Sequence, residues 1–154
     1  MPISAAIANK LRCWGFYWFA CYRGTGGRAT YIAPDWSEIR IEVPLSWRTR
    51  NYVGTIFGGS LYGAVDPIYM TMLIRRLGPE YIVWDKAATI RFKKPGRETL
   101  RARFLVPDEE LASIRSSLES QRSVDRVYTV RLADPAGAVC AEIEKVLYVR
   151  RRSP

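Results

Sequence analysis

The chain has 154 residues, a net charge of +9, and a composition that is 48% hydrophobic and 25% charged. These values suit one globular domain with its own hydrophobic core and exclude a disordered chain. The absence of histidine excludes Ser-His-Asp and Cys-His nucleophile systems and histidine-ligated zinc. Cys13, Cys21 and Cys140 lack metal-ligand spacing, so we expect no metal site, no disulfide framework and a reducing, cytoplasmic location.

The basic charge favours anionic partners, which could be nucleic acid, a membrane surface or a phosphate-bearing small molecule. A solvated basic surface with no specific target is an equal alternative. The chain carries no helix-turn-helix, zinc or RNA-binding signature, so we expect no nucleic-acid partner. The apolar run at 13–22 is about half of the ~20 residues that cross a bilayer, so we expect no membrane span.

The segment at 1–22 predicts an N-terminal helix with a very aromatic second half. We expect this helix to pack on the domain as a cover over a pocket. Cys13 and Cys21, eight residues apart, would then share one buried face. The glycine-rich "RGTGGR" that follows predicts a turn, because a phosphate cradle needs a strand before it and a helix after it.

The next segment alternates in polarity and predicts a half-buried hairpin strand. Its apolar side chains face one way and its charged ones the other: Ile39, Ile41 and Val43 against Glu38, Arg40 and Glu42. A loop at 46–57 precedes a predicted helix at 58–77, which ends at Gly78-Pro79.

The remaining chain predicts two strands joined at Pro95-Gly96, a short helix "DEELASIRSSLES", two strands around "PAG", and a frayed tail at 150–154. Only the helix at 58–77 is long and mostly apolar, so the sheet must bury it. The residues therefore predict a single α+β domain over 1–154, with one antiparallel sheet wrapped around one central helix.

The central helix opens with Gly58-Gly59. Unpaired N–H groups and a partial positive charge at a helix N-terminus suit a carbonyl oxygen that is becoming an oxyanion. Glycine also lets a substrate approach the backbone closely. The alternative is that these glycines only permit a turn and tight packing.

Asp66 places a carboxylate in the apolar part of the same helix, immediately before the helix breaker Pro67. Burying an unpaired charge is costly, and an interior proline costs an ordinary helix about 3 kcal/mol. A carboxylate at a kink therefore indicates a functional site. A structural ion pair, for instance with Lys86, is the alternative.

The stretch "NYVGTIFGGSLYGAVD", residues 51–66, resembles the active-site segment of hotdog-fold acyl-CoA thioesterases of the phenylacetyl-CoA thioesterase-like class. Those read approximately N-x-x-G-T-x-H-G-G, with an acidic residue seven positions after the second glycine. The order of predicted elements also fits this family over nearly the whole chain. One departure is Phe57, which stands where better-studied members have histidine, as in an uncharacterised branch.

The resemblance implies a hotdog fold and an acyl-CoA thioesterase that needs no cofactor beyond the coenzyme A of its substrate. Gly58 would supply the oxyanion-hole N–H, Asn51 would position the thioester, and Asp66 would be the base or nucleophile. Phe57 and Gly59 would lie against the substrate. A non-catalytic hotdog protein that binds an acyl-CoA or a fatty acyl ligand is the alternative, which Phe57 favours.

Five further positions are weaker candidates. Asp85 falls near a position that orients water in some members of the family. Strand parity puts Trp84, Lys86, Ile90 and Phe92 on the helix side, which would turn Lys86 inward to pair with a carboxylate. Lys93, Lys94 and Arg97, near a turn, could contact the phosphates of coenzyme A, or form a merely solvated basic turn.

The spacing of Gly58 and Asp66 predicts a homodimer, which could pair further into a tetramer. Eight residues of helix separate them by roughly 12 Å. An oxyanion donor and the group that attacks the same carbonyl must both lie about 3 Å from it. Two helices packed antiparallel about a twofold axis would bring Gly58 of one chain near Asp66 of the other, which is also the arrangement known in the hotdog family.

Overall fold

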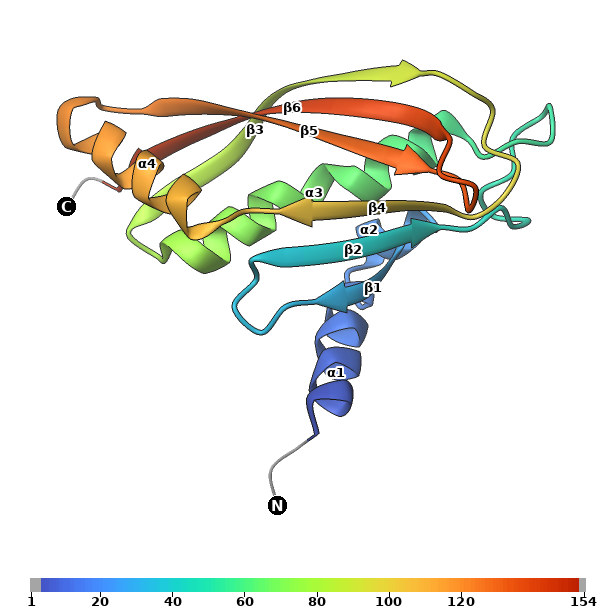
Figure 1. Ribbon diagram of the computed structural model, residues 1–154, viewed down its shortest axis with the longest axis horizontal. Coiled ribbons are helices and arrows are strands. Elements are labelled where there is room, and N and C mark those ends of the chain that lie inside the picture. The colour runs from blue at the N-terminus through green and yellow to red at the C-terminus, as the bar shows by residue number, and fades with distance from the viewer. Residues whose placement is uncertain (1–3, 153–154) are drawn as a thin grey trace.

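The computed structural model describes residues 4–152, and its strands pair into one antiparallel sheet (Figure 1). The strands are β1 (Arg28–Ile32), β2 (Glu38–Val43), β3 (Tyr81–Phe92), β4 (Leu100–Leu105), β5 (Val124–Ala133) and β6 (Val139–Arg151). Their order in the sheet is β1-β2-β4-β5-β6-β3, so β1 and β3 form its two edges. The helices are α1 (Ala5–Tyr17), α2 (Ala20–Gly24), α3 (Gly58–Leu77) and α4 (Asp108–Ser120). The predicted α+β architecture, a sheet around a long helix with a helix before it, is confirmed.

Strand β2 shows why the alternating sequence forms this sheet. Successive side chains of a strand point to opposite faces. Ile39, Ile41 and Val43 are accordingly buried. On the outer face, the guanidinium of Arg103 from β4 donates to Glu38 at 2.7 Å, and this lowers the pKa of Glu38 to about 2.

Helix α3 packs one side against β2, β3 and β6. Leu61, Ile68 and Met72 recur at helical spacing on that side and are fully or almost fully buried. The opposite side carries half-buried residues, among them Asp66 and Pro67. The helix continues through Pro67 and ends before Gly78, whose φ of 101° suits glycine. The helix bounds predicted from the sequence are those observed.

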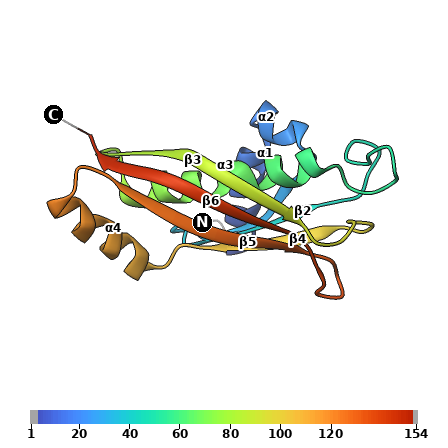
Figure 2. The same cartoon turned by 90° about the horizontal axis from the view of Figure 1, so that it is seen from above.

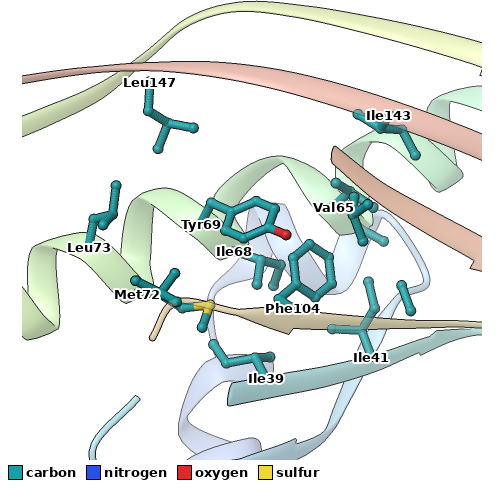
Figure 3. Close-up of a cluster of buried hydrophobic side chains, with 14 of the residues drawn as sticks. Ile39, Ile41, Val65, Ile68, Tyr69, Met72, Leu73, Phe104, Ile143 and Leu147 are labelled. Carbon is teal, nitrogen blue, oxygen red and sulfur yellow. The ribbon is translucent and has the colours of Figure 1, made fainter. Parts of the chain in front are cut away.

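The rings of Tyr69 and Phe104 lie among aliphatic side chains in the core between α3 and the sheet (Figure 3). Phe104 of β4 meets Tyr69 of α3 edge-to-face with ring centroids 5.1 Å apart. Tyr69 also stacks on Tyr128 of β5 at 4.5 Å. The Tyr128 hydroxyl donates to Glu110 of α4 at 2.6 Å, which ties this short helix to β5. Figure 2 shows α4 beside the start of β5, at the end of the molecule away from α2.

The predicted N-terminal helix is present, but it does not run unbroken to residue 22, because the chain forms α1 and α2 with a break at Trp18-Phe19. Residues 1–3 of that prediction lie outside the described part of the chain. Helix α1 packs on the edge strand β1 through polar side chains. Asn9 accepts a hydrogen bond from the N–H of Ile32 at 2.9 Å, and Arg12 donates to the Ile32 carbonyl at 3.0 Å. Within residues 4–152, no helix is both long and apolar enough to span a membrane.

Two other local predictions are wrong. Cys13 and Cys21 do not share a buried face, because the break puts them on separate helices, where Cys13 is half-buried and Cys21 exposed. The tail predicted at 150–154 begins too early, because β6 continues to Arg151, which pairs with Tyr81 of β3. Residues 153 and 154 lie outside the described part of the chain.

Replacing Phe104 with Ala should lower the free energy of unfolding by about 3–5 kcal/mol, because this side chain is fully buried and its removal leaves a cavity. Urea denaturation would measure the change. Leu105→Ala is the matched control, since Leu105 is the next residue of β4 and is 47% exposed. A control variant as unstable as Phe104→Ala would contradict this assignment of the core.

Candidate functional site

Helix α3 begins without a side-chain cap. Phe57 is its N-cap residue, and the carbonyl of Phe57 accepts from the N–H groups of Ser60 and Leu61. No described residue accepts a hydrogen bond from the N–H of Gly58 or Gly59. Two donors at the positive end of a helix therefore remain available to an oxygen atom of a ligand.

Both glycines lie close to aromatic rings. A Cβ atom on Gly58 would lie 2.7 Å from Cζ of Phe92, and one on Gly59 would lie 2.3 Å from Cε1 of Phe57. Any larger residue would push these rings away. Tight packing, the simpler interpretation of the glycine pair, is thus present together with the free N–H groups.

Asn51 shapes the loop that leads into α3. Its side-chain oxygen accepts from the N–H groups of Val53 and Thr55 at 3.1 and 3.0 Å, and its amide donates to the Thr55 hydroxyl at 2.9 Å. Asn51 and Gly58 line one hollow of about 440 Å³, referred to below as the polar hollow. The structure brings these two predicted site residues together.

Lys93 and Lys94 line the same polar hollow, whereas Arg97 is exposed outside its lining. The Lys94 ammonium donates to Asp134 at 3.0 Å, and this hydrogen bond raises the pKa of Lys94. Lys93 makes no side-chain ion pair within residues 4–152. The polar hollow therefore has positive charge beside the free helix N-terminus.

Asp66 is held by two partners. The Tyr62 hydroxyl, one turn earlier on α3, donates to Oδ1 of Asp66 at 2.7 Å, and the ammonium of Lys145 on β6 donates to the same oxygen at 2.5 Å. The Lys145 side chain is fully buried, whereas that of Asp66 is 42% exposed. Among the described residues no group hydrogen-bonds to Oδ2 of Asp66, so this oxygen is free to accept a hydrogen bond.

Lys145 joins Asp66 to a second predicted residue, Asp85 of β3. Oδ1 of Asp85 lies 2.8 Å from the ammonium nitrogen but makes no well-directed hydrogen bond, so this contact is mainly an attraction of opposite charges. Burial raises the pKa of Asp85, against the lowering effect of Lys145. Burial alone would lower the pKa of Lys145, but the two carboxylates outweigh it and raise that pKa.

The inward orientation predicted for Lys86 is wrong. A bulge between Asp85 and Ala87 shifts the register of β3 against β6. Before the bulge, Tyr81 and Val83 are buried and Trp84 faces outward, which reverses the predicted parity there. Lys86 is 53% exposed and pairs with Asp125 at 2.5 Å, so it is not the partner of Asp66.

Lys145 and Tyr62 are the residues of this cluster that the sequence interpretation missed. For both, a pattern in the sequence could have indicated the role. Ile143, Lys145 and Leu147 alternate on one face of β6, and that face is buried. A lysine on the buried face of a strand requires a counter-charge. Tyr62 precedes Asp66 by four residues, the spacing at which helical side chains meet.

Gly58 and Asp66 open into different spaces of the single chain. Gly58 lines the polar hollow, and Asp66 lines a separate cavity of about 660 Å³ between α3 and the N-terminal helices. Within one protomer, the N-terminus of α3 and the Asp66 carboxylate therefore line two different cavities. The described residues contain no group of three or more Cys, Asp or Glu side chains that could hold a metal ion.

The fold is a hotdog fold shared with solved proteins that are described as thioesterases. A protein of unknown function and probable thioesterase from Pseudomonas aeruginosa has a TM-score of 0.81 and 19% identity, covering 99% of each chain. A thioesterase from Haemophilus influenzae has a TM-score of 0.67 and 14% identity, covering 98% of this chain and 93% of its own. A protein of unknown function from Chlorobaculum tepidum has a TM-score of 0.72 and 15% identity, covering 95% of each chain.

The model of one family, DUF4442, matches residues 10–149. The chain therefore belongs to this family, which is described as a domain of unknown function. No curated protein matches the sequence.

Lys145→Met should lower the free energy of unfolding at pH 7 by about 3 kcal/mol, because it leaves two carboxylates without their buried counter-charge. The loss should shrink as the pH falls. A carboxyl group whose pKa is raised by folding favours the folded state when it is protonated, and Asp85 is such a group. Urea denaturation from pH 4 to pH 8 would measure both effects.

Lys86→Met is the matched control, because it removes an exposed lysine one residue from Asp85. Its cost should be about 0–1 kcal/mol, as for a surface ion pair. Equal losses for the two variants, or a Lys145→Met deficit that does not change with pH, would contradict the role of the buried ammonium.

Proposed function

We propose that this protein is an acyl-CoA thioesterase that acts as a homodimer. The observation that carries the proposal is Asp66, whose Oδ1 is fixed by Tyr62 and Lys145 while Oδ2 remains free on a partly exposed side chain. This is the arrangement that a general base needs, because it orients the carboxylate and leaves one oxygen for a water molecule. The similarity to structures described as thioesterases supports the same reaction.

In the proposed mechanism, water loses a proton to Oδ2 of Asp66 and attacks the thioester carbonyl. The N–H groups of Gly58 and Gly59 stabilise the oxyanion that forms, and the thiolate of coenzyme A leaves and takes up a proton. Asn51 acts by holding the loop before Gly58, through its hydrogen bonds to Val53 and Thr55. Direct attack by Asp66 to form an anhydride is the variant of this mechanism.

The polar hollow is the proposed site of the carrier. Lys93 and Lys94 place positive charge beside the N-terminus of α3, and the phosphates of coenzyme A are anionic. Because Lys94 already pairs with Asp134, Lys93 is the stronger candidate of the two. Arg97 could contact phosphate only outside this hollow.

A second copy of the chain would complete the site. Strand β3 lies at the edge of the sheet beside α3, and its central residues, from Ala87 to Thr89, are exposed. A long exposed edge strand invites pairing with another strand. Pairing of two β3 strands about a twofold axis would bring the two α3 helices together. Gly58 of one chain and Asp66 of the other would then act on the same thioester.

Asp66→Asn should lower turnover of acyl-CoA by about 100-fold or more, because it removes the proton acceptor while keeping the size of the side chain. Substrate affinity should change far less, since the N–H groups of Gly58 and Gly59 remain. Hydrolysis monitored through the released thiol would measure turnover, and sedimentation would confirm the dimer. A stable dimer that retains wild-type turnover would exclude Asp66 as the base.

A non-catalytic acyl-CoA-binding protein is the second candidate, which Phe57 favours. The Phe57 side chain is 56% exposed and its ring lies against Gly59, where the resembling enzymes have a histidine. The ring makes the surroundings of the free N–H groups less polar. Whether the protein is a thioesterase or a binding protein, the Phe57 ring can make an aromatic contact with the ligand.

Phe57→His should raise thioesterase turnover, because an imidazole beside the N-terminus of α3 adds a polar group next to the oxyanion. The comparison of kcat and KM over a panel of acyl-CoA thioesters would test this. Phe57→Leu is the control, since it removes the ring without adding a polar group. If Phe57→His binds acyl-CoA as the wild type does and neither protein hydrolyses it, the binding function is the correct one.

A further inference from the structure

The outward side of α1 carries an exposed apolar stripe that continues to the C-cap residue of the helix. Its side chains recur at intervals of three and four residues, so they lie on one side of the helix. Each is 52–60% exposed, and together they are called the outer stripe: Ile7, Leu11, Trp14 and Trp18. The rings of Trp14 and Trp18 meet edge-to-face with centroids 5.2 Å apart. The stripe is therefore a connected surface rather than a set of scattered residues.

The opposite side of α1 is fixed on the domain. Asn9 and Arg12 hydrogen-bond to Ile32 of β1, and Phe16 is buried in the core. Figure 1 shows α1 extending below β1, away from the remaining strands. The helix is thus held in one orientation with its outer stripe turned to solvent. An exposed apolar surface of this kind marks an interaction site.

The charges in this part of the chain have one sign. Residues 1–34 contain no Asp or Glu but four cationic residues, which are Lys10, Arg12, Arg23 and Arg28. Arg28 already pairs with Glu42 of β2 at 2.6 Å. Lys10 and Arg23 are exposed and form no ion pair with any described residue. Lys10 directly precedes Leu11 of the outer stripe, so a free positive charge borders the apolar surface.

Of the partners that could cover this stripe, an anionic lipid surface fits it best. Ile7 and Leu11 have no ring on which a nucleic-acid base could stack. A second copy of the same surface would bring like charges together. Tryptophan settles at the headgroup level of a bilayer, and exposed lysine and arginine attract anionic lipids. The combination of aliphatic, indole and cationic side chains therefore matches a lipid surface.

We propose that the outer stripe docks on the surface of an anionic lipid bilayer, with α1 lying in the plane of the interface. Such a helix turns its apolar side to the acyl chains and keeps its charges among the headgroups. Ile7, Leu11 and the two indole rings enter the boundary between headgroups and acyl chains, and Lys10 contacts lipid phosphate. The inference goes beyond the proposed thioesterase activity and does not depend on it.

Co-sedimentation of the full chain with lipid vesicles would measure the binding. Vesicles of phosphatidylcholine mixed with phosphatidylglycerol are anionic, and vesicles of phosphatidylcholine alone carry no net charge. The wild type should bind the anionic vesicles about 10-fold more tightly than the neutral ones. High salt should reduce this preference, because it screens the attraction between exposed charges.

Trp14→Ala tests the apolar part of the surface. It should weaken binding to the anionic vesicles about 10-fold, because one indole ring no longer leaves water. Trp84→Ala is the matched control and should bind as the wild type does. Trp84 is 55% exposed but lies on β3, at the opposite edge of the sheet from β1, on which α1 packs. Urea denaturation would confirm that both variants are folded.

Lys10→Glu tests the charge without altering the stripe. It should weaken binding to the anionic vesicles about 10-fold, because it replaces attraction by repulsion at the lipid surface. Arg122→Glu is the matched control, since it lowers the net charge by the same amount. Arg122 is exposed just after α4, at the end of the molecule away from α2 (Figure 2). Its reversal should change binding by less than about twofold, because salt screens distant charges.

Three results would overturn the inference. The first is that the wild type does not bind anionic vesicles, or binds neutral vesicles equally well. The second is that each variant binds as its own control does. The third is that another partner covers the stripe in place of lipid. Sedimentation would reveal a second copy if Trp14→Ala alone dissociates an oligomer, and a single-stranded RNA oligonucleotide that Trp14→Ala alone fails to bind would indicate nucleic acid.

Discussion

The buried ammonium of Lys145 is the constraint on which the site depends. Removing this charge from water costs several kcal/mol unless opposite charges lie against it. Asp66 on α3 and Asp85 on β3 supply them, at 2.5 and 2.8 Å. The three side chains therefore connect the central helix, the inner face of β6 and the edge strand β3 at one point. The position of the Asp66 carboxylate follows from this connection.

One side of helix α3 packs in the core, and its opposite side carries residues of the candidate site. Its apolar side is buried by β2, β3 and β6, which leaves its opposite side for Gly63, Asp66 and Pro67. The free N–H groups at its start and the carboxylate at its middle open into two separate spaces. A rigid helix cannot bring its start and its middle together, so a site that uses both needs a second copy of the chain.

Helix α1 contacts the rest of the domain through polar as well as apolar side chains. In α1 the polar residues Asn9 and Arg12 face the sheet and hydrogen-bond to Ile32, whereas Trp14 is 60% exposed. These directed hydrogen bonds fix α1 on β1, and Phe16 of the same helix is buried in the core. The space that α1 and α2 leave beside α3 is the cavity that Asp66 lines.

The sequence by itself determined the elements and most of the fold. Alternation in β2, the apolar run from 58 to 77 and the glycine after it are local patterns, and each one specifies its own element. The same patterns placed Gly58 at a helix start and Asp66 on the helix that follows.

Only the tertiary structure decided the partner of Asp66. A single bulge reversed the parity of β3 beside Asp85, and Lys145 lies 79 residues from Asp66. Contacts of this kind depend on strand register and on packing across the sheet, which local periodicity does not encode.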